Sequence, residues 1–137
     1  MTNITSDSVL IDAPAARVYE FLCNFNNYQM IMPDQVEDWQ SNHNEGSFSI
    51  KNMASIGLVI TERMPFNLIK LVKTKAPFYL DLDCKISEMS EGIQCQLQLV
   101  MQADLNMMMK ILATQPLTNL VNTLAYNCKK VIENGTE

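Results

Sequence analysis

Few residues in this sequence are of types and spacings that could carry out acid–base chemistry. The one histidine, His43, lies in the polar segment Ser41–Gly46, which has the composition of a turn. Glu62 lies near the end of an alternating apolar segment. It is an even number of residues from the side chains expected to face inward, so it would lie on the same side of the strand as they do. Burial there would raise its pKa and suit it to general acid–base catalysis or to a polar contact with a ligand. An exposed carboxylate that pairs with a neighbouring cation is the alternative.

Other reactive groups do not form a recognisable site. The four cysteines, Cys23, Cys84, Cys95 and Cys128, are scattered and include no C-x-x-C pair. This pattern indicates neither a zinc site nor a disulfide scaffold, and we expect reduced thiols in the core. The sequence contains no phosphate-binding loop, dinucleotide fingerprint or nucleophile elbow. We therefore expect no metal and no cofactor.

The composition predicts one folded domain over residues 1–137. The chain is 47% hydrophobic and 18% charged, which is typical of a globular core rather than of a disordered acidic segment. Ten Lys and Arg residues against fifteen Asp and Glu residues leave a net charge of −5, so nucleic acid and anionic surfaces are poor partners. There is no leader-like start and no apolar run near the ~18 residues of a spanning helix. We expect a cytoplasmic protein without integral membrane association.

The first third of the chain predicts a strand and two helical segments. Thr5–Asp12 reads as a strand that ends at Pro14, a residue suited to the first position of a helix. From Ala15 the apolar residues recur at helical spacing, which gives one buried stripe. Tyr28–Met32 predicts a second, short helical turn that Pro33 ends.

The middle of the chain changes to a period of two, which predicts an antiparallel meander with one apolar face. Asp81 and Asp83 fall on the opposite, solvated face. The expected strands are Val36–Asn42, Gly46–Lys51, Ile56–Arg63, Leu68–Lys75, Phe78–Ile86 and Ile93–Met101.

The last segment returns to helical spacing after Asp104, a plausible N-cap. Its apolar stripe, which includes Leu117, Leu120, Leu124 and Val131, must pack against the apolar face of the sheet. Pro116 should break or kink this helix because it lacks an N–H group. Leu105–Ala113, with three consecutive methionines, would then be a separately angled lead-in.

This order of elements resembles a known superfamily. The residues that carry the resemblance are Val9–Pro14 followed by Val18–Leu22 and Asn27-Tyr28, then Ala103–Asn106 and Pro116-Leu117. Together they resemble the START-like superfamily, which includes polyketide cyclase/dehydrase and lipid-transport proteins, over essentially the whole chain. The resemblance implies an α+β helix-grip fold in β-α-α-β6-α order. It implies a curved antiparallel sheet of about seven strands around a C-terminal helix kinked near Pro116, with a cavity for an apolar small molecule between them.

The expected ligand-binding residues are the large apolar side chains on the inner strand positions and on the lead-in segment. Ten methionines among 137 residues favour such a site, because flexible thioethers adapt to varied apolar guests. The predicted residues are Trp39, Phe48, Ile50, Leu58, Ile60, Phe78, Leu80, Leu82, Leu97, Leu99, Met101, Met108, Met109 and Leu112.

Three functions remain open from the sequence. The leading one is binding or carrying an apolar, lipid-like or polycyclic molecule. The second is an enzyme of the cyclase/dehydratase kind that uses Glu62 or His43, which the apolar inward faces disfavour. The third is an interaction module with a filled core, in which the lead-in segment forms a homodimer.

Overall fold

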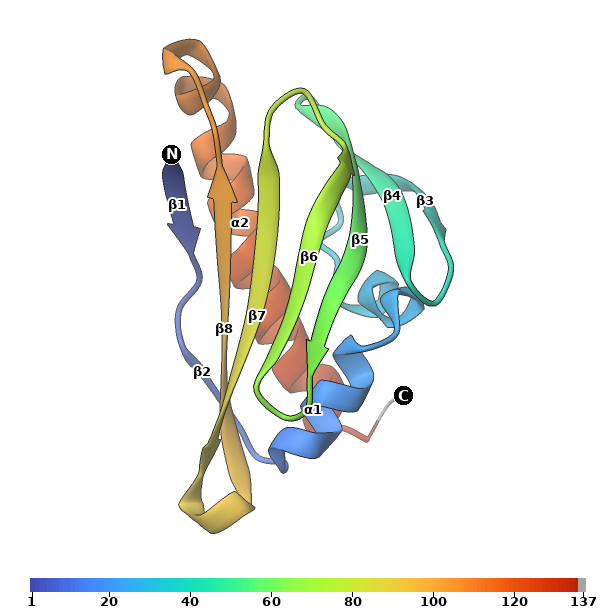
Figure 1. The fold of residues 1–137 in the computed structure, drawn as a ribbon, viewed down its shortest axis with the longest axis vertical. Helices are drawn as coiled ribbons and strands as arrows, with labels where there is room; N and C mark the ends of the chain where they lie inside the picture. Colours follow the sequence, from blue (N-terminus) through green and yellow to red (C-terminus); the bar gives the residue numbers. More distant parts are fainter. Residues whose placement is uncertain (136–137) are drawn as a thin grey trace.

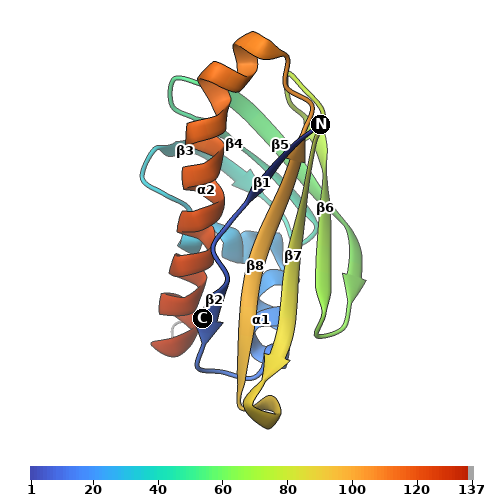
Figure 2. The same cartoon turned by 90° about the vertical axis from the view of Figure 1, so that its left-hand side faces the viewer.

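An eight-stranded antiparallel sheet curves around one long helix in the computed structural model, which describes residues 1–135 (Figures 1 and 2). The strands follow one another in space in the order β1-β8-β7-β6-β5-β4-β3, and β2 also pairs with β8. The strands are β1 Thr2–Thr5, β2 Val9–Ile11, β3 Val36–Ser41, β4 Glu45–Ile50, β5 Ala54–Met64, β6 Leu68–Lys75, β7 Leu80–Met89 and β8 Gln94–Ala103. The helices are α1 Ala15–Leu22, α2 Met107–Glu133 and the 3-10 segments η1 Phe25–Ile31 and η2 Ser90–Gly92.

The N-terminal segment forms two short strands instead of the single strand predicted over Thr5–Asp12. Ser6 separates them and keeps the segment joined to β8. Its N–H group donates to the Leu99 oxygen at 2.8 Å, and its hydroxyl accepts from the Leu99 N–H group at 2.9 Å. The side chain thus replaces a ladder bond where the strand is interrupted. The sheet consequently has eight strands rather than about seven.

The central meander confirms the period-two prediction. β6 has the predicted bounds, and the other strands differ from prediction by a few residues at their ends. Phe78, predicted to start a strand, lies in the loop before β7 and is still buried. The 3-10 helix η1 begins earlier than predicted because the Asn24 side chain accepts a hydrogen bond from the Asn26 N–H group at 3.0 Å and caps it.

The C-terminal helix is one continuous element. Its N-cap is Asn106 rather than Asp104, because the Asn106 side chain accepts from the Met109 N–H group at 2.8 Å. The helix is not broken at Pro116: Ala113 and Leu117, on either side of the proline, are both fully buried, and their packing holds the two parts together. Figure 2 shows the first turns of α2, in orange, bending away from the axis of the remainder.

The core lies between the concave face of the sheet and α2. The buried stripe of α2 includes Leu117, Leu120, Leu124 and Cys128, as predicted, and Ile132 takes the buried place expected for Val131. Side-chain bonds fix the neighbouring elements to α2, since the Asn127 amide donates to the Ile31 oxygen at 3.0 Å. No buried side-chain nitrogen or oxygen lacks a partner within residues 1–135.

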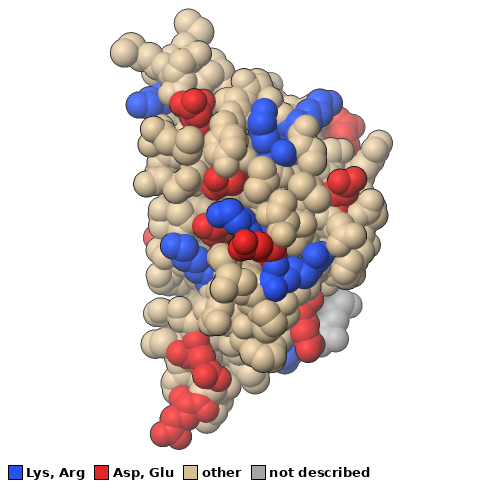
Figure 3. Space-filling view, viewed as in Figure 1, with Lys and Arg blue, Asp and Glu red and all other residues tan. Residues whose placement is uncertain are grey.

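The convex face of the sheet carries charges of both signs (Figure 3). Lys70 on β6 pairs with Asp83 on β7, with 3.2 Å between Nζ and Oδ1. Asp81, expected to be solvated, is only 6% exposed, because Tyr79 lies over it and donates a hydrogen bond of 2.6 Å to its carboxylate. None of the helices in the described part of the chain is long and apolar enough to cross a membrane. The same residues include no group of three His, Cys, Asp or Glu side chains that could hold a metal ion.

Candidate functional site

A small apolar void lies between the concave face of the sheet and the middle of α2. Its volume is about 10 Å3, and its wall exposes no polar atom. A buried water needs both about 10–15 Å3 and several polar partners, so this void is dry. The wall residues are Tyr28, Met32, Phe48, Ile56, Leu58, Leu80, Leu82, Met101, Leu120 and Leu124.

Regular spacing within each element produces this wall. Ile56 and Leu58 on β5 are two residues apart, as are Leu80 and Leu82 on β7, so each pair points to the same side of its strand. Leu120 and Leu124 are four residues apart and share one face of α2. Because the sheet curves around α2, these faces converge on one volume (Figure 2).

Met32 is the wall residue nearest to solvent. It is the one wall residue that is partly exposed, while the other nine are buried. It follows η1 directly and precedes Pro33. A flexible thioether therefore separates the void from solvent at this position.

Tyr28 contributes its ring to the wall and keeps its hydroxyl away from the void. The hydroxyl donates to the Leu22 oxygen at 2.9 Å and lies 3.9 Å from the Cys84 sulfur. The Leu22 oxygen belongs to the last turn of α1, where carbonyls lack partners within the helix. Burial raises the pKa of Tyr28 well above its ordinary value, so the phenol stays neutral.

A stack of four aromatic rings supports one side of the wall. Tyr28, Phe25, Trp39 and Phe48 follow one another with centroid separations of 4.8, 5.4 and 5.7 Å and nearly parallel planes. Trp39 lies within this stack rather than in the wall, and its Nε1 donates to the Ser41 hydroxyl at 2.9 Å. The stack fixes the positions of the two rings that do line the void, Tyr28 and Phe48.

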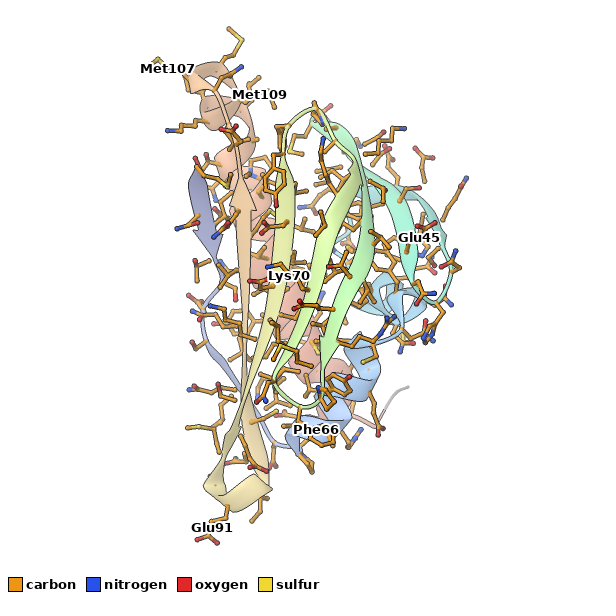
Figure 4. All side chains as sticks on the ribbon, viewed as in Figure 1. Glu45, Phe66, Lys70, Glu91, Met107 and Met109 are labelled. Atoms are coloured by element: carbon orange, nitrogen blue, oxygen red, sulfur yellow. The ribbon has the colours of Figure 1, made fainter. Side chains whose placement is uncertain are left out.

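The structure brings five of the predicted ligand-binding residues to the void: Phe48, Leu58, Leu80, Leu82 and Met101. Five more are buried in the core outside its wall: Ile50, Ile60, Phe78, Leu97 and Leu99. Met109 is half-buried near the start of α2 (Figure 4). Met108 and Leu112 are exposed. The start of the helix at Asn106 and its continuity through Pro116 determine which residues face the core. Ala113 therefore faces inward, and Met108 and Leu112 face outward.

Sequence reasoning missed five wall residues: Tyr28, Met32, Ile56, Leu120 and Leu124. Leu120 and Leu124 belong to the predicted apolar stripe of the helix, and Ile56 has the parity of Leu58, so the periodicity carried a signal for them. Tyr28 lies in a 3-10 segment and Met32 directly follows it, so no periodicity marks either residue. The abundance of methionine was the one signal that favoured Met32.

Neither candidate for acid–base chemistry lines the void. The pairing of β5 with β6 shifts register between Ile60 and Glu62, so Glu62 loses the parity of the inner positions. It is exposed and pairs across the strands with Lys70 at the centre of the outer face (Figure 4). His43 is exposed in the turn between β3 and β4, where its main-chain oxygen accepts from the Phe25 N–H group at 2.9 Å.

Three of the four cysteines are buried, which agrees with their predicted place in the core. Burial raises the pKa of Cys84 to about 12 and also raises the pKa values of Cys95 and Cys128. These thiols are therefore protonated and poorly nucleophilic. Cys23 is half-buried.

Comparison with known proteins identifies the fold. No protein-family model and no curated protein matches the chain. Among solved structures, a START superfamily protein from Mycobacterium smegmatis superimposes with a TM-score of 0.70 at 14% identity, over 98% of this chain and 99% of that one. The chain has the START-like, helix-grip fold.

Two other structures agree with this fold. The protein XoxI from Bacillus cereus gives a TM-score of 0.77 at 10% identity over 100% of both chains. A conserved protein from Geobacillus kaustophilus gives 0.71 at 11% identity over 99% of this chain and 98% of that one. The predicted α+β helix-grip fold is thus confirmed, and sequence identities this low extend no further than the fold.

Proposed function

We propose that the protein binds or carries an apolar small molecule, lipid-like or polycyclic, in the space between the curved sheet and α2. The observation that carries this proposal is a void with a wholly apolar wall, in which a single partly exposed and flexible side chain, Met32, lies between the void and solvent. In this proposal the structure represents the closed form. The START-like fold supports it by placing a concave sheet against a long helix.

The void must widen to hold a guest. Pockets for small molecules usually measure about 300–1,000 Å3, against the 10 Å3 present here. A guest that loses about 300 Å2 of apolar surface gains about 7 kcal/mol before ordering costs. Micromolar binding corresponds to about 8 kcal/mol, so opening must cost little if binding is to reach that range.

The wall contains the side chains best able to move. Met32, directly after η1, and Met101 on β8 both line the void, and each has three rotatable bonds and a polarizable sulfur. Ile31, directly before Met32, is held to α2 by the Asn127 amide. Opening at this point therefore involves the Met32 side chain and the chain that follows it.

Titration with an uncharged apolar dye, N-phenylnaphthylamine, tests the proposal. We expect saturable binding to the unmodified protein and stronger binding to Met32→Ala, which removes the side chain between the void and solvent. Leu120→Trp should abolish binding because it fills the void. Ile93→Trp, at a residue that is 66% exposed on the β7–β8 hairpin, is the matched control and should leave binding unchanged.

The same titration addresses the filled-core alternative, which the small size of the void favours. If neither the unmodified protein nor Met32→Ala takes up dye saturably, the carrier proposal fails. If both bind dye and a folded Leu120→Trp variant binds it equally, the dye occupies another place and the proposed site is wrong. Circular dichroism establishes that each variant is folded.

A further inference from the structure

The outward face of α2 lacks charge over an unusual length. No Asp, Glu, Lys or Arg occurs from Ile111 to Cys128, a stretch of five helical turns. Surface helices normally present charged residues on the side away from the core. Here the outward face begins with side chains that are both apolar and largely exposed: Met107 at 82%, Met108 at 71%, Ile111 at 79% and Leu112 at 58%.

The outward residues also follow the spacing of a helix that pairs with another helix. Met108, Leu112, Gln115 and Asn119 are separated by four, three and four residues, which is the spacing of the a and d positions of a heptad. All four are exposed. We call Met107, Met108, Ile111, Leu112, Gln115 and Asn119 the outer α2 surface.

The next two positions of the same spacing, Asn122 and Tyr126, are already occupied. The Asp7 N–H group donates to Asn122 Oδ1 at 2.8 Å, and the Tyr126 hydroxyl donates to the Asp7 carboxylate at 2.9 Å. The N-terminal segment therefore covers the lower half of the helix, and the upper half remains open. Figure 2 shows the upper half at the edge of the molecule, and Figure 4 shows Met107 at its extreme end.

We infer that the outer α2 surface is a homodimer interface, in which two copies pair through antiparallel α2 helices about a twofold axis near Leu112. A twofold contact places the same surface on both partners, so the surface must complement itself. Antiparallel pairing about this axis sets the exposed apolar side chains of one copy beside those of the other, with Met108 next to Gln115.

Charge favours a second copy as the occupant. The chain carries a net charge of −5, so two copies repel each other over most of their surfaces. The uncharged face of α2 is where they can meet without opposing like charges, and interface cores are typically depleted in charged residues. An anionic membrane would instead be favoured by a group of basic residues, whereas α2 offers Lys110 alone before Lys129.

Hydrogen bonding and area agree with this occupant. The Gln115 amide donates to Asn119 Oδ1 at 3.0 Å, which leaves the Gln115 oxygen and the Asn119 amide group for the other copy. The four exposed apolar side chains form a patch of a few hundred Å2, about the size of the largest patch on a typical monomer. A standard interface takes about 800 Å2 from each partner. The exposed side chains of Gln115 and Asn119, one and two turns further along the helix, extend the contact beyond this patch.

Light scattering after size exclusion, at tens of micromolar protein, tests the inference. We expect the unmodified chain to run at twice its 15.5 kDa mass. Ile111→Glu and Leu112→Glu should each weaken the dimer by roughly a hundredfold or more and give monomers. Each substitution places a carboxylate in the interface opposite the same carboxylate of the other copy. Ile93→Glu changes an equally exposed apolar residue outside this surface and should remain dimeric.

Cross-linking places the axis. Leu112→Cys should form a disulfide-linked dimer under mild oxidation, whereas Ile93→Cys should not. A monomeric unmodified chain, or a dimer that persists in both glutamate variants, overturns the inference. So does a monomer that sediments with phosphatidylglycerol vesicles, because the surface would then contact lipid.

Discussion

The hydroxyl of Tyr28 donates a hydrogen bond of 2.9 Å to the main-chain oxygen of Leu22 inside the core. This bond joins η1 to the last turn of α1 and holds the Tyr28 ring against the void. Tyr28→Phe keeps the ring and leaves the Leu22 oxygen buried without this donor. We expect a loss of about 1–3 kcal/mol in the free energy of unfolding, measured by urea denaturation. Tyr126→Phe, at an exposed tyrosine, should cost less, and equal losses would contradict this role for Tyr28.

Enlarging the void should lower the stability of the fold and at the same time create space for an apolar guest. Leu82→Ala removes part of its wall and should lower the free energy of unfolding by about 2–5 kcal/mol. An apolar guest such as benzene should then raise the melting temperature of this variant, because it fills the space. Leu97→Ala is the control, since Leu97 is just as buried but lies outside the wall. If benzene raises the melting temperature of both variants equally, the void is no better suited to an apolar guest than the rest of the core.

The strands were predictable because one face of the antiparallel sheet is apolar and buried. Alternation alone placed Leu80 and Leu82 on the inner side of β7, and both line the void. The same rule taken alone places Glu62 inward, whereas the structure has the exposed carboxylate that was the alternative. A register shift in β5 between Ile60 and Glu62 reverses the alternation, and it leaves no mark in a period-two pattern. The alternation of residues along a strand therefore predicts which side chains face inward only up to the next β-bulge.

The lead-in segment shows a second limit. The prediction that Met108 and Leu112 line the cavity treated the residues before Pro116 as a separate element. In the structure the buried positions Ala113 and Leu117 continue across the proline and set the phase of the whole helix. The size of the void was also beyond prediction, because it depends on how side chains from η1, β4, β5, β7, β8 and α2 interlock.

Alkaline pH should destabilise the fold. Burial raises the pKa of Cys84 to about 12 and raises the pKa of Tyr28 well above its ordinary value. Above the ordinary thiol pKa of 9.0 the unfolded chain loses the Cys84 proton while the folded chain keeps it. The unfolded state then binds fewer protons, so stability falls as pH rises, by up to about 1.4 kcal/mol per pH unit for each such group.

Urea denaturation across the range from about pH 8 to pH 11 measures this slope. Cys84→Ala should make it shallower, because this variant lacks the buried thiol. A slope that is equally steep without Cys84 would show that this thiol does not contribute to the alkaline transition.

Gly46 allows close contact between the β3–β4 hairpin and the aromatic stack. A Cβ atom added at this position would lie 2.5 Å from Phe25 Cε2 and 2.7 Å from the Gln40 oxygen. Neither neighbour can retreat easily, because Phe25 is stacked between Tyr28 and Trp39 and Gln40 contributes main chain. Gly46→Ala should therefore lower the free energy of unfolding by about 1–3 kcal/mol. Ser47→Ala, at the adjacent position, should change it by less than about 0.5 kcal/mol. If both variants melt at the same temperature as the unmodified protein, the hairpin accommodates a methyl group and the stack does not depend on this contact.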